Sequence, residues 1–165
     1  MLDEEGLLMA EETCEGCARV VEGGTAQCRA RFEALLARDF SDPRFFGVHR
    51  LFVDCYCLQH PEDYCASAKS LAAHLVGLAQ ILDEAASPAT GSPDLRSWLD
   101  GNRKLDKPAV PAMRGAVTLG DLDGIEEPAA WREAVRGWAE STWEAYRELH
   151  PVARRWAAEA GKRGG

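Results

Sequence analysis

The sequence lacks any apolar run long enough to cross a membrane, and it lacks a basic stripe. No segment approaches the roughly 20 apolar residues that a membrane-spanning helix needs, so we expect no membrane insertion. The net charge is −8 over 165 residues, and without clustered Lys and Arg a nucleic-acid partner is disfavoured. The start, MLDEEGLLMAEETC, has no basic residue and only a short apolar run, unlike a secretory signal. These absences predict a cytoplasmic protein.

Internal repeats and segments of alternating apolar and polar residues are also missing. Alternation is the pattern of a half-buried strand, so we predict an all-α helical bundle. A length of 165 residues suits a single domain. We expect a flexible leader at 1–12, one helical domain at 13–160 and a flexible tail at 161–165. Residues 13–28 would form a Cys-rich segment like a zinc knuckle. The sequence does not identify a binding partner, and a homodimer is one alternative.

Apolar periodicity with start and stop signals places the helices. Ser41 or Asp42 can cap a helix that has Pro43 in its first turn, and His60 should end it because it precedes Pro61. The predicted helices span residues 26–40, 44–59, 62–86 and 128–160, with shorter helices near 94–101 and 117–124, a loop at 87–93 and an irregular segment at 106–115.

Six cysteines in a reducing compartment favour metal or thiol chemistry over a disulfide framework. Cys14 and Cys17 are separated by two residues on a glycine-containing turn, and Cys28 follows a Gly-rich segment. Two thiolates at this spacing can face one tetrahedral ion, so the pattern predicts a zinc site. A redox pair and three free thiols are the alternatives.

The fourth ligand must come from elsewhere in the fold. If the first two long helices form an antiparallel hairpin, Cys28 lies level with the end of the second helix. His60, released from that helix by Pro61, can then turn toward Cys28. Cys57 and Asp54 are the other candidates.

His49 and His60 cannot share one ion while the helix between them is intact. Eleven residues give a rise of about 16 Å, and zinc–nitrogen bonds are only about 2 Å. A hairpin that turns at Pro61 would bring His49 level with His74, and His150 could project toward them. These three histidines, with Asp54 nearby, form a predicted second site; the alternative is that each is a core histidine.

Two further pairs follow from the same hairpin. Cys57 and Cys65 would lie side by side, either as a reversible thiol pair or as small buried hydrophobes. Asp54 could pair with Arg50 or Lys69 instead of serving a site.

The order of these motifs resembles a family of small bacterial proteins of unknown function, DUF5946. The motifs are CxxC, a Cys that opens a helix, FFGVHRLFVDCYCLQHP, SAKSLAAHLVGL, RGAVTLGDL and WAESTWEAYRELHPVARRW. The resemblance covers Cys14 to Trp156. Residues that fit the family pattern are Cys14, Cys17, Cys28, His49, Asp54, Tyr56, Gln59, His60, Ser67, His74, Trp138, Trp143 and His150.

Four positions depart from that pattern, namely Cys55, Cys57, Cys65 and Leu149. The departure at Cys57 favours His60 as the fourth ligand. Relatives often have paired histidines at 149–150, so the second site would here be one ligand short. The resemblance implies no activity.

Three functions remain in competition. The first is a metal-binding helical protein with a structural zinc knuckle and a role in interaction or regulation. The second is a metal-dependent, hydrolase-like enzyme that uses His49, His74 and His150. The third is a thiol redox or metal-handling protein.

Overall fold

The structure of the protein is a computed structural model that describes residues 10–87 and 95–162. It is mostly helical, as predicted. Its elements in chain order are β1 (Glu11–Thr13), β2 (Val20–Glu22), α1 (Gly24–Ser41), α2 (Pro43–Phe46), α3 (His49–Gln59), α4 (Pro61–Tyr64), α5 (Ala68–Leu82), α6 (Leu95–Asp100), the 3₁₀ helix η1 (Leu119–Leu122), α7 (Pro128–Ala145), the 3₁₀ helix η2 (Arg147–Leu149) and α8 (His150–Gly161).

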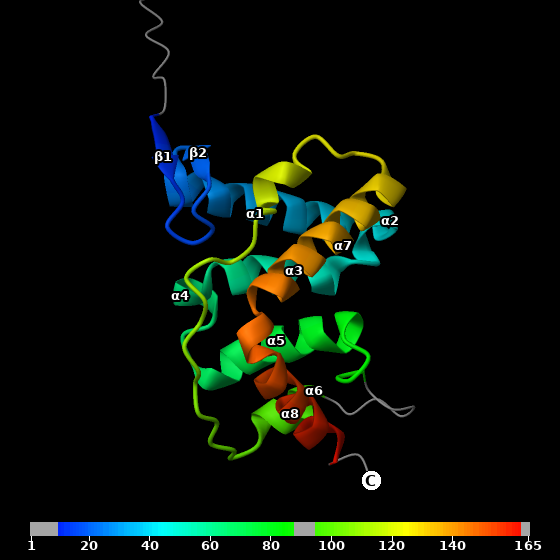
Figure 1. Cartoon of the computed structure of the whole chain (residues 1–165). Coiled ribbons are helices and arrows are strands. Elements are labelled where there is room, and N and C mark those ends of the chain that lie inside the picture. Colours follow the sequence, from blue (N-terminus) through cyan, green and yellow to red (C-terminus); the bar gives the residue numbers. More distant parts are fainter. Residues whose placement is uncertain (1–9, 88–94, 163–165) are drawn as a thin grey trace, which may run out of the picture.

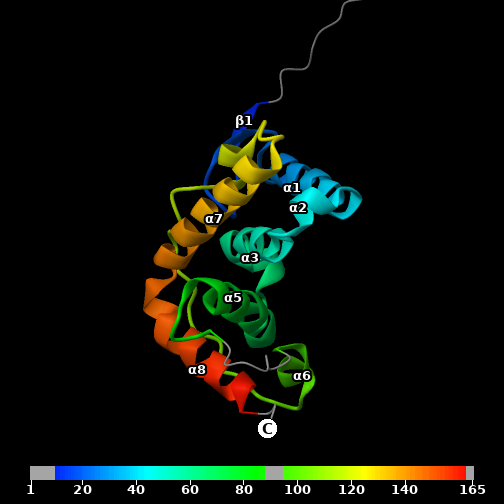
Figure 2. The same cartoon turned by 90° about the vertical axis from the view of Figure 1, so that its right-hand side faces the viewer.

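Four helices lie one below another, and two more run along one side of them. Figure 2 shows α1, α3, α5 and α6 in this order, with α7 and α8 forming the side column. Helix α3 packs on α5 and α7, and α5 packs on α8. The β1–β2 hairpin lies at one end of the stack and α6 at the other (Figure 1).

Helical periodicity explains which residues reach the core. In α7 the buried residues Trp131, Val135, Trp138 and Thr142 are spaced three or four apart, and residues at this spacing share one face of a helix. Helix α3 is buried on almost every side after Val53, because it lies between α1, α5 and α7. The end of α3 therefore sits deep in the molecule.

Three predicted helices are broken. The helix predicted at 44–59 is interrupted at Gly47–Val48. Its predicted cap is present, because Arg44 N donates to Asp42 Oδ1 at 3.0 Å. The helix predicted at 62–86 is interrupted at Cys65–Ser67, where Ser67 begins α5 with a capping box. The helix predicted at 128–160 changes direction at Tyr146, and Pro151 occupies the first turn of α8, a position that proline tolerates.

The two strands are an addition to the all-α prediction. They pair antiparallel, with Glu11 opposite Glu22 and Thr13 opposite Val20. Each has only three residues, too few for an alternating pattern to stand out. Glu11 and Glu12 thus belong to a strand within the predicted leader. Residues 1–9, 88–93 and 163–165, which the predictions assign to leader, loop and tail, lie outside the described residues.

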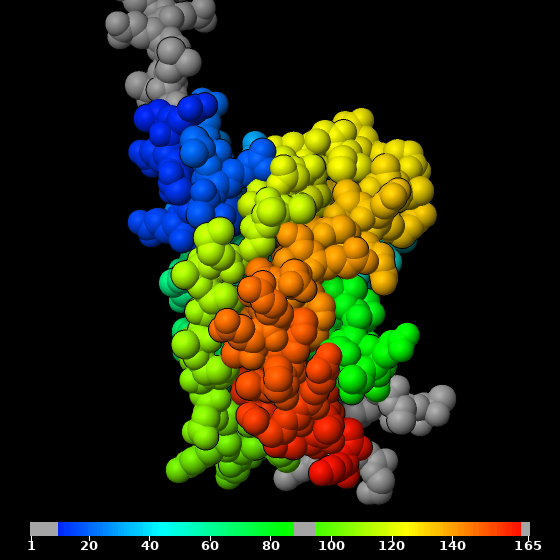
Figure 3. Space-filling model, in the orientation of Figure 1, coloured from blue at the N-terminus to red at the C-terminus, as the bar shows by residue number. Residues whose placement is uncertain are grey.

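The irregular segment predicted at 106–115 is confirmed. It runs from α6 back to η1 beside α7 and α8, as Figures 1 and 3 show. Buried Gln59 holds it: Gln59 Nε2 donates to the carbonyl oxygens of Arg114 and Val117 at 2.9 and 2.7 Å, and its Oε1 accepts from Trp138 Nε1 at 3.0 Å. No helix among the described residues is both long and apolar enough to span a membrane.

Candidate metal centre

The four predicted ligands come together at one point of the fold. The ligand atoms of Cys14, Cys17, Cys28 and His60 all lie within 4.8 Å of one another. Cys14 and Cys17 belong to the turn between the two strands, Cys28 to the first turns of α1, and His60 to the end of α3. Cys14, Cys28 and His60 are buried, and Cys17 is partly exposed.

The turn of the hairpin places its two sulfurs by backbone hydrogen bonds. Cys14 N donates to Arg19 O at 2.8 Å, and Ala18 N donates to Cys14 O at 2.9 Å. The chain reverses through Ala18, which has a φ of 61°, a left-handed conformation uncommon for residues other than glycine. The turn is therefore tightly closed around the position between Cys14 and Cys17.

His60 leaves the helix where Pro61 requires it to. Its φ of −125° and ψ of 53° are not helical, as expected for a residue before proline. Its Nδ1 lies 2.8 Å from Tyr56 O, so Nδ1 carries the proton and donates. Nε2 then has a free lone pair, and it lies 3.4 Å from Cys14 Sγ and 3.5 Å from Cys28 Sγ. A carbonyl that orients a histidine in this way is typical of metal-ligating histidines.

Aromatic rings fix the plane of the His60 imidazole. The Tyr56 ring stacks on it with 4.0 Å between centroids, and Phe32 of α1 stacks on Tyr56 at 3.8 Å. On the other side, the close approach of the turn needs Gly16, since a Cβ there would stand 2.1 Å from His60 Cδ2. The imidazole is thus clamped between α1, α3 and the hairpin turn.

The separations fit a tetrahedral zinc ion. Zinc–sulfur bonds of about 2.3 Å and zinc–nitrogen bonds of about 2.0–2.1 Å at tetrahedral angles place sulfur and nitrogen about 3.6 Å apart. The distances from His60 Nε2 to the sulfurs of Cys14 and Cys28, 3.4 and 3.5 Å, are close to this value. Three thiolates and one imidazole are also a donor set that zinc commonly takes in structural sites.

The proton balance of the cluster favours a cation. A hydrogen bond from the Cys28 thiol lowers the pKa of Cys17 to about 4, while that bond to Cys17 and burial raise the pKa of Cys28. One thiolate forms readily, and its charge opposes ionisation of the Cys28 thiol. A bound cation removes this opposition, which is why metal binding releases protons from such clusters.

Two arginines that the sequence did not single out fasten the hairpin to the helices. Arg114 Nη1 donates to Gly16 O at 2.8 Å, and the Arg114 guanidinium pairs with Glu62 of α4. Arg19 pairs with Asp121 of η1 at 2.9 Å. Both contacts span long stretches of sequence, so only the folded chain shows them.

The sequence that forms this arrangement matches the model of one known protein family. A family described as "Family of unknown function (DUF5946)" matches residues 12–147, which include all four ligands. The chain belongs to the DUF5946 family. No curated protein matches it, and no solved structure does.

In this DUF5946 protein the predicted second site does not assemble. His49, His74 and His150 do not converge as the sequence analysis predicted. His49 Nδ1 lies 3.3 Å from buried Asp39 Oδ2, and its ring stacks on Phe46. His150 Nε2 donates to Trp143 O at 2.9 Å, and its ring stacks on Trp143. Of the metal-ligating side chains in the described ranges, only the four around Cys14 form a group of three or more.

The prediction paired His74 with the wrong residue of α3. His74 Nδ1 meets Asp54 Oδ1 at 2.9 Å, while His49 turns to Asp39. His74 therefore faces Asp54 and not His49. Asp54 also pairs with Arg50, as one of the predicted alternatives, whereas Lys69 donates to Gly101 O.

The other three cysteines are buried free thiols. Cys65 Sγ donates to Cys57 O at 3.5 Å, so its thiol is directed at a carbonyl rather than at the Cys57 sulfur. Burial raises the pKa of Cys65 to about 12 and raises the pKa of Cys57 and Cys55 as well. Thiols that stay protonated are poor nucleophiles, and this favours the packing interpretation over a thiol pair.

Proposed function

We propose that this protein binds one zinc ion through Cys14, Cys17, Cys28 and His60, and that the ion has a structural role. The observation that carries the proposal is the meeting of four ligand atoms within 4.8 Å. The Cys-rich hairpin of residues 10–23 would then be a zinc knuckle. The ion would join it to α1 and to the end of α3, which are distant in sequence.

A structural role is favoured over catalysis by the closure of the site. Catalytic zinc usually has three protein ligands and one open position, whereas structural zinc has four. All four donors here are protein side chains, and three of them are buried. We infer that the ion stabilises the fold and that the helical surface serves interaction or regulation. Six cysteines that form no disulfide also fit a reducing compartment such as the cytoplasm.

Elemental analysis of protein purified without an affinity metal tests the proposal. We expect about one zinc per chain in the wild type. Cys14→Ser and Cys28→Ser should each lower the zinc content sharply, because each removes a ligand. Cys57→Ala is the matched control: it removes a buried thiol outside the cluster and should leave the zinc content unchanged.

Cobalt provides a second readout in the same variants. Cobalt(II) added to the metal-free wild type should give the strong thiolate-to-cobalt absorption of a tetrahedral sulfur-rich site, and Cys28→Ser should weaken it. Wild-type protein that contains no zinc and gives no such absorption would refute the proposal. So would zinc that stays bound in both cysteine-to-serine variants.

A further inference from the structure

Asp54 is a charged group buried at the interface of α3 and α5. Its side chain is 0% exposed, and both carboxylate oxygens have hydrogen-bond partners within the protein. Oδ2 accepts from Arg50 Nε at 2.7 Å, and Oδ1 accepts from His74 Nδ1 at 2.9 Å. A buried carboxylate is costly unless it is paired and hydrogen-bonded, and this pairing holds the side chains of Arg50 and His74 in fixed positions.

The backbone of α5 is shaped to receive these groups. A Cβ at Gly77 would stand 2.3 Å from Arg50 Nη2 and 2.5 Å from Asp54 Oδ2, so the absence of a side chain there makes room for the pair. Arg50 Nη2 also donates to Ala73 O at 2.8 Å. The guanidinium is therefore anchored at two points, Asp54 of its own helix α3 and Ala73 of α5.

Anchoring leaves most of the Arg50 donors unused. A guanidinium has five N–H groups, and Arg50 directs one to Asp54 and one to Ala73. Within the described parts of the chain the other three have no hydrogen-bond partner. The side chain is 54% exposed, so these donors face solvent from a fixed position. A preorganised guanidinium fork is well suited to bind a carboxylate or a phosphate.

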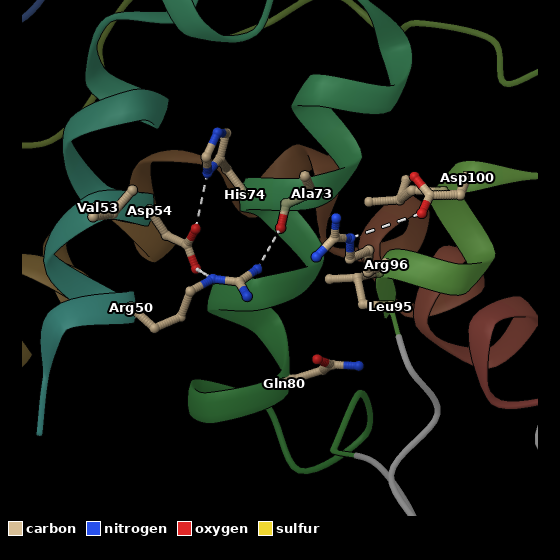
Figure 4. Close-up of a pocket in the computed structure, with 10 residues that line it drawn as sticks. Arg50, Val53, Asp54, Ala73, His74, Gln80, Leu95, Arg96 and Asp100 are labelled. Atoms are coloured by element: carbon tan, nitrogen blue, oxygen red, sulfur yellow. Dashed lines mark hydrogen bonds and ion pairs between the residues drawn. The ribbon is translucent and has the colours of Figure 1, made fainter.

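These donors face a cleft. It has a volume of about 580 Å³ and lies between α3, α5 and α6, within the range of small-molecule sites. Figure 4 shows Arg50 and Arg96 extending from its two sides, with Gln80 at one end. Asp100, which pairs with Arg96 at 3.8 Å, also lines the cleft. Its apolar walls are made by Val53, Leu95 and Leu99.

We propose that this cleft binds a small organic anion, with the Arg50 guanidinium on its carboxylate or phosphate group and the leucines of α6 on its apolar body. His74 acts as a positioning residue, because its Nδ1–H holds the carboxylate on which Arg50 is anchored. Gln80 provides a neutral polar contact. The cleft shares no residue with the metal cluster, so this proposal stands or falls independently of the zinc proposal.

The test is an NMR titration of the full chain as purified, followed through backbone amides and the Arg50 Nε–H signal. The probes are phenyl phosphate, benzoate and inorganic phosphate, each against sodium chloride at matched ionic strength. We expect phenyl phosphate or benzoate to shift signals of Arg50, Ala73 and Gln80, and the stronger of the two identifies the anionic group. Inorganic phosphate should bind about tenfold more weakly, because it has no apolar body to bury.

Two variants separate recognition from a bracing role of the ion pair. Arg50→Gln should weaken binding of the organic anion at least about tenfold, because it removes a charge-assisted contact. Arg136→Gln is the matched control: Arg136 also pairs with a carboxylate four residues later, Glu140, and is 57% exposed, but it lies outside the cleft. It should titrate as the wild type does.

Gln80→Glu keeps the test valid if Arg50→Gln disturbs the fold. It leaves Arg50 and Asp54 in place and adds a negative charge at the cleft, so it should weaken anion binding. The proposal is overturned if neither organic anion shifts these signals beyond the chloride control. It is equally overturned if Gln80→Glu, together with any folded Arg50→Gln, titrates as the wild type does.

Discussion

Gly16 contributes no side chain to the candidate metal site, yet the site depends on it. It lies between the two cysteines of the hairpin turn, and its Cα faces the imidazole of His60. A Cβ at this position would stand 2.1 Å from His60 Cδ2, well inside van der Waals contact. The obstacle is a ring already held by Tyr56, so it has little freedom to move.

Gly16→Ala should therefore displace His60 from the cluster. We expect zinc affinity to fall about tenfold or more, the range typical of changes to groups that orient a ligand, as measured by competition with a chelator. The control is Gly137→Ala on the exposed face of α7, where a Cβ meets nothing within 4 Å. That variant should keep its zinc and gain about 1 kcal/mol of stability. Equal zinc affinity in both variants would contradict the clamp around His60.

At the scale of elements, short interruptions decide which helix faces meet. The break at Cys65–Ser67 is fixed by Ser67 and Ser70: Ser67 Oγ accepts from Ser70 N, and Ser70 Oγ accepts from Ser67 N, both at 3.0 Å. This reciprocal cap begins α5 at Ala68. The start of α5 in turn sets which of its residues lie opposite α3.

Ser67→Ala should destabilise the protein by about 1 kcal/mol, because it leaves an amide at the start of α5 without its side-chain acceptor. Urea denaturation followed by circular dichroism measures this. Ser41→Ala is a suitable control, since the Ser41 hydroxyl only donates to Arg38 O within its own helix, and we expect a change of no more than about 0.5 kcal/mol. If the two variants lose the same stability, the cap does not position α5.

At the scale of the molecule, the candidate metal site lies at the edge of one continuous core, since Cys14 and Cys28 are buried in the same apolar cluster as the helices. The core contains the large buried side chains of α3, α5, α7 and α8, among them Phe52, Leu75, Trp138 and Trp156. The hairpin contributes few apolar groups to it. We infer that the ion adds the hairpin to a helical assembly that already has its own core.

Removing zinc with a chelator should therefore loosen the hairpin and leave most helices intact. Hydrogen exchange read by mass spectrometry should show faster exchange at residues 10–28 and little change in α5, α7 and α8. Lowering the pH should have the same effect, because protonation of the thiolates competes with the metal. Adding zinc back should restore protection. Loss of protection throughout the chain would show instead that the ion is needed for the whole fold.

The sequence by itself determined the helical class and the main parts of the metal cluster. Helical periodicity is a local property, and it predicted helices over most of the residues that are helical. The CxxC turn and the effect of Pro61 on His60 are also local, because covalent geometry and backbone sterics act over a few residues. These were enough to bring Cys14, Cys17, Cys28 and His60 into one prediction.

Only the tertiary structure decided which distant residues meet. The predicted pair was His49 and His74, and the observed pair is Asp54 and His74. The direction in which each of these side chains points depends on packing as well as on local sequence. The contacts of Arg114 with Gly16 and of Arg50 with Ala73 likewise join segments that no periodicity relates. Such contacts follow from how whole helices pack, and packing depends on the entire chain at once.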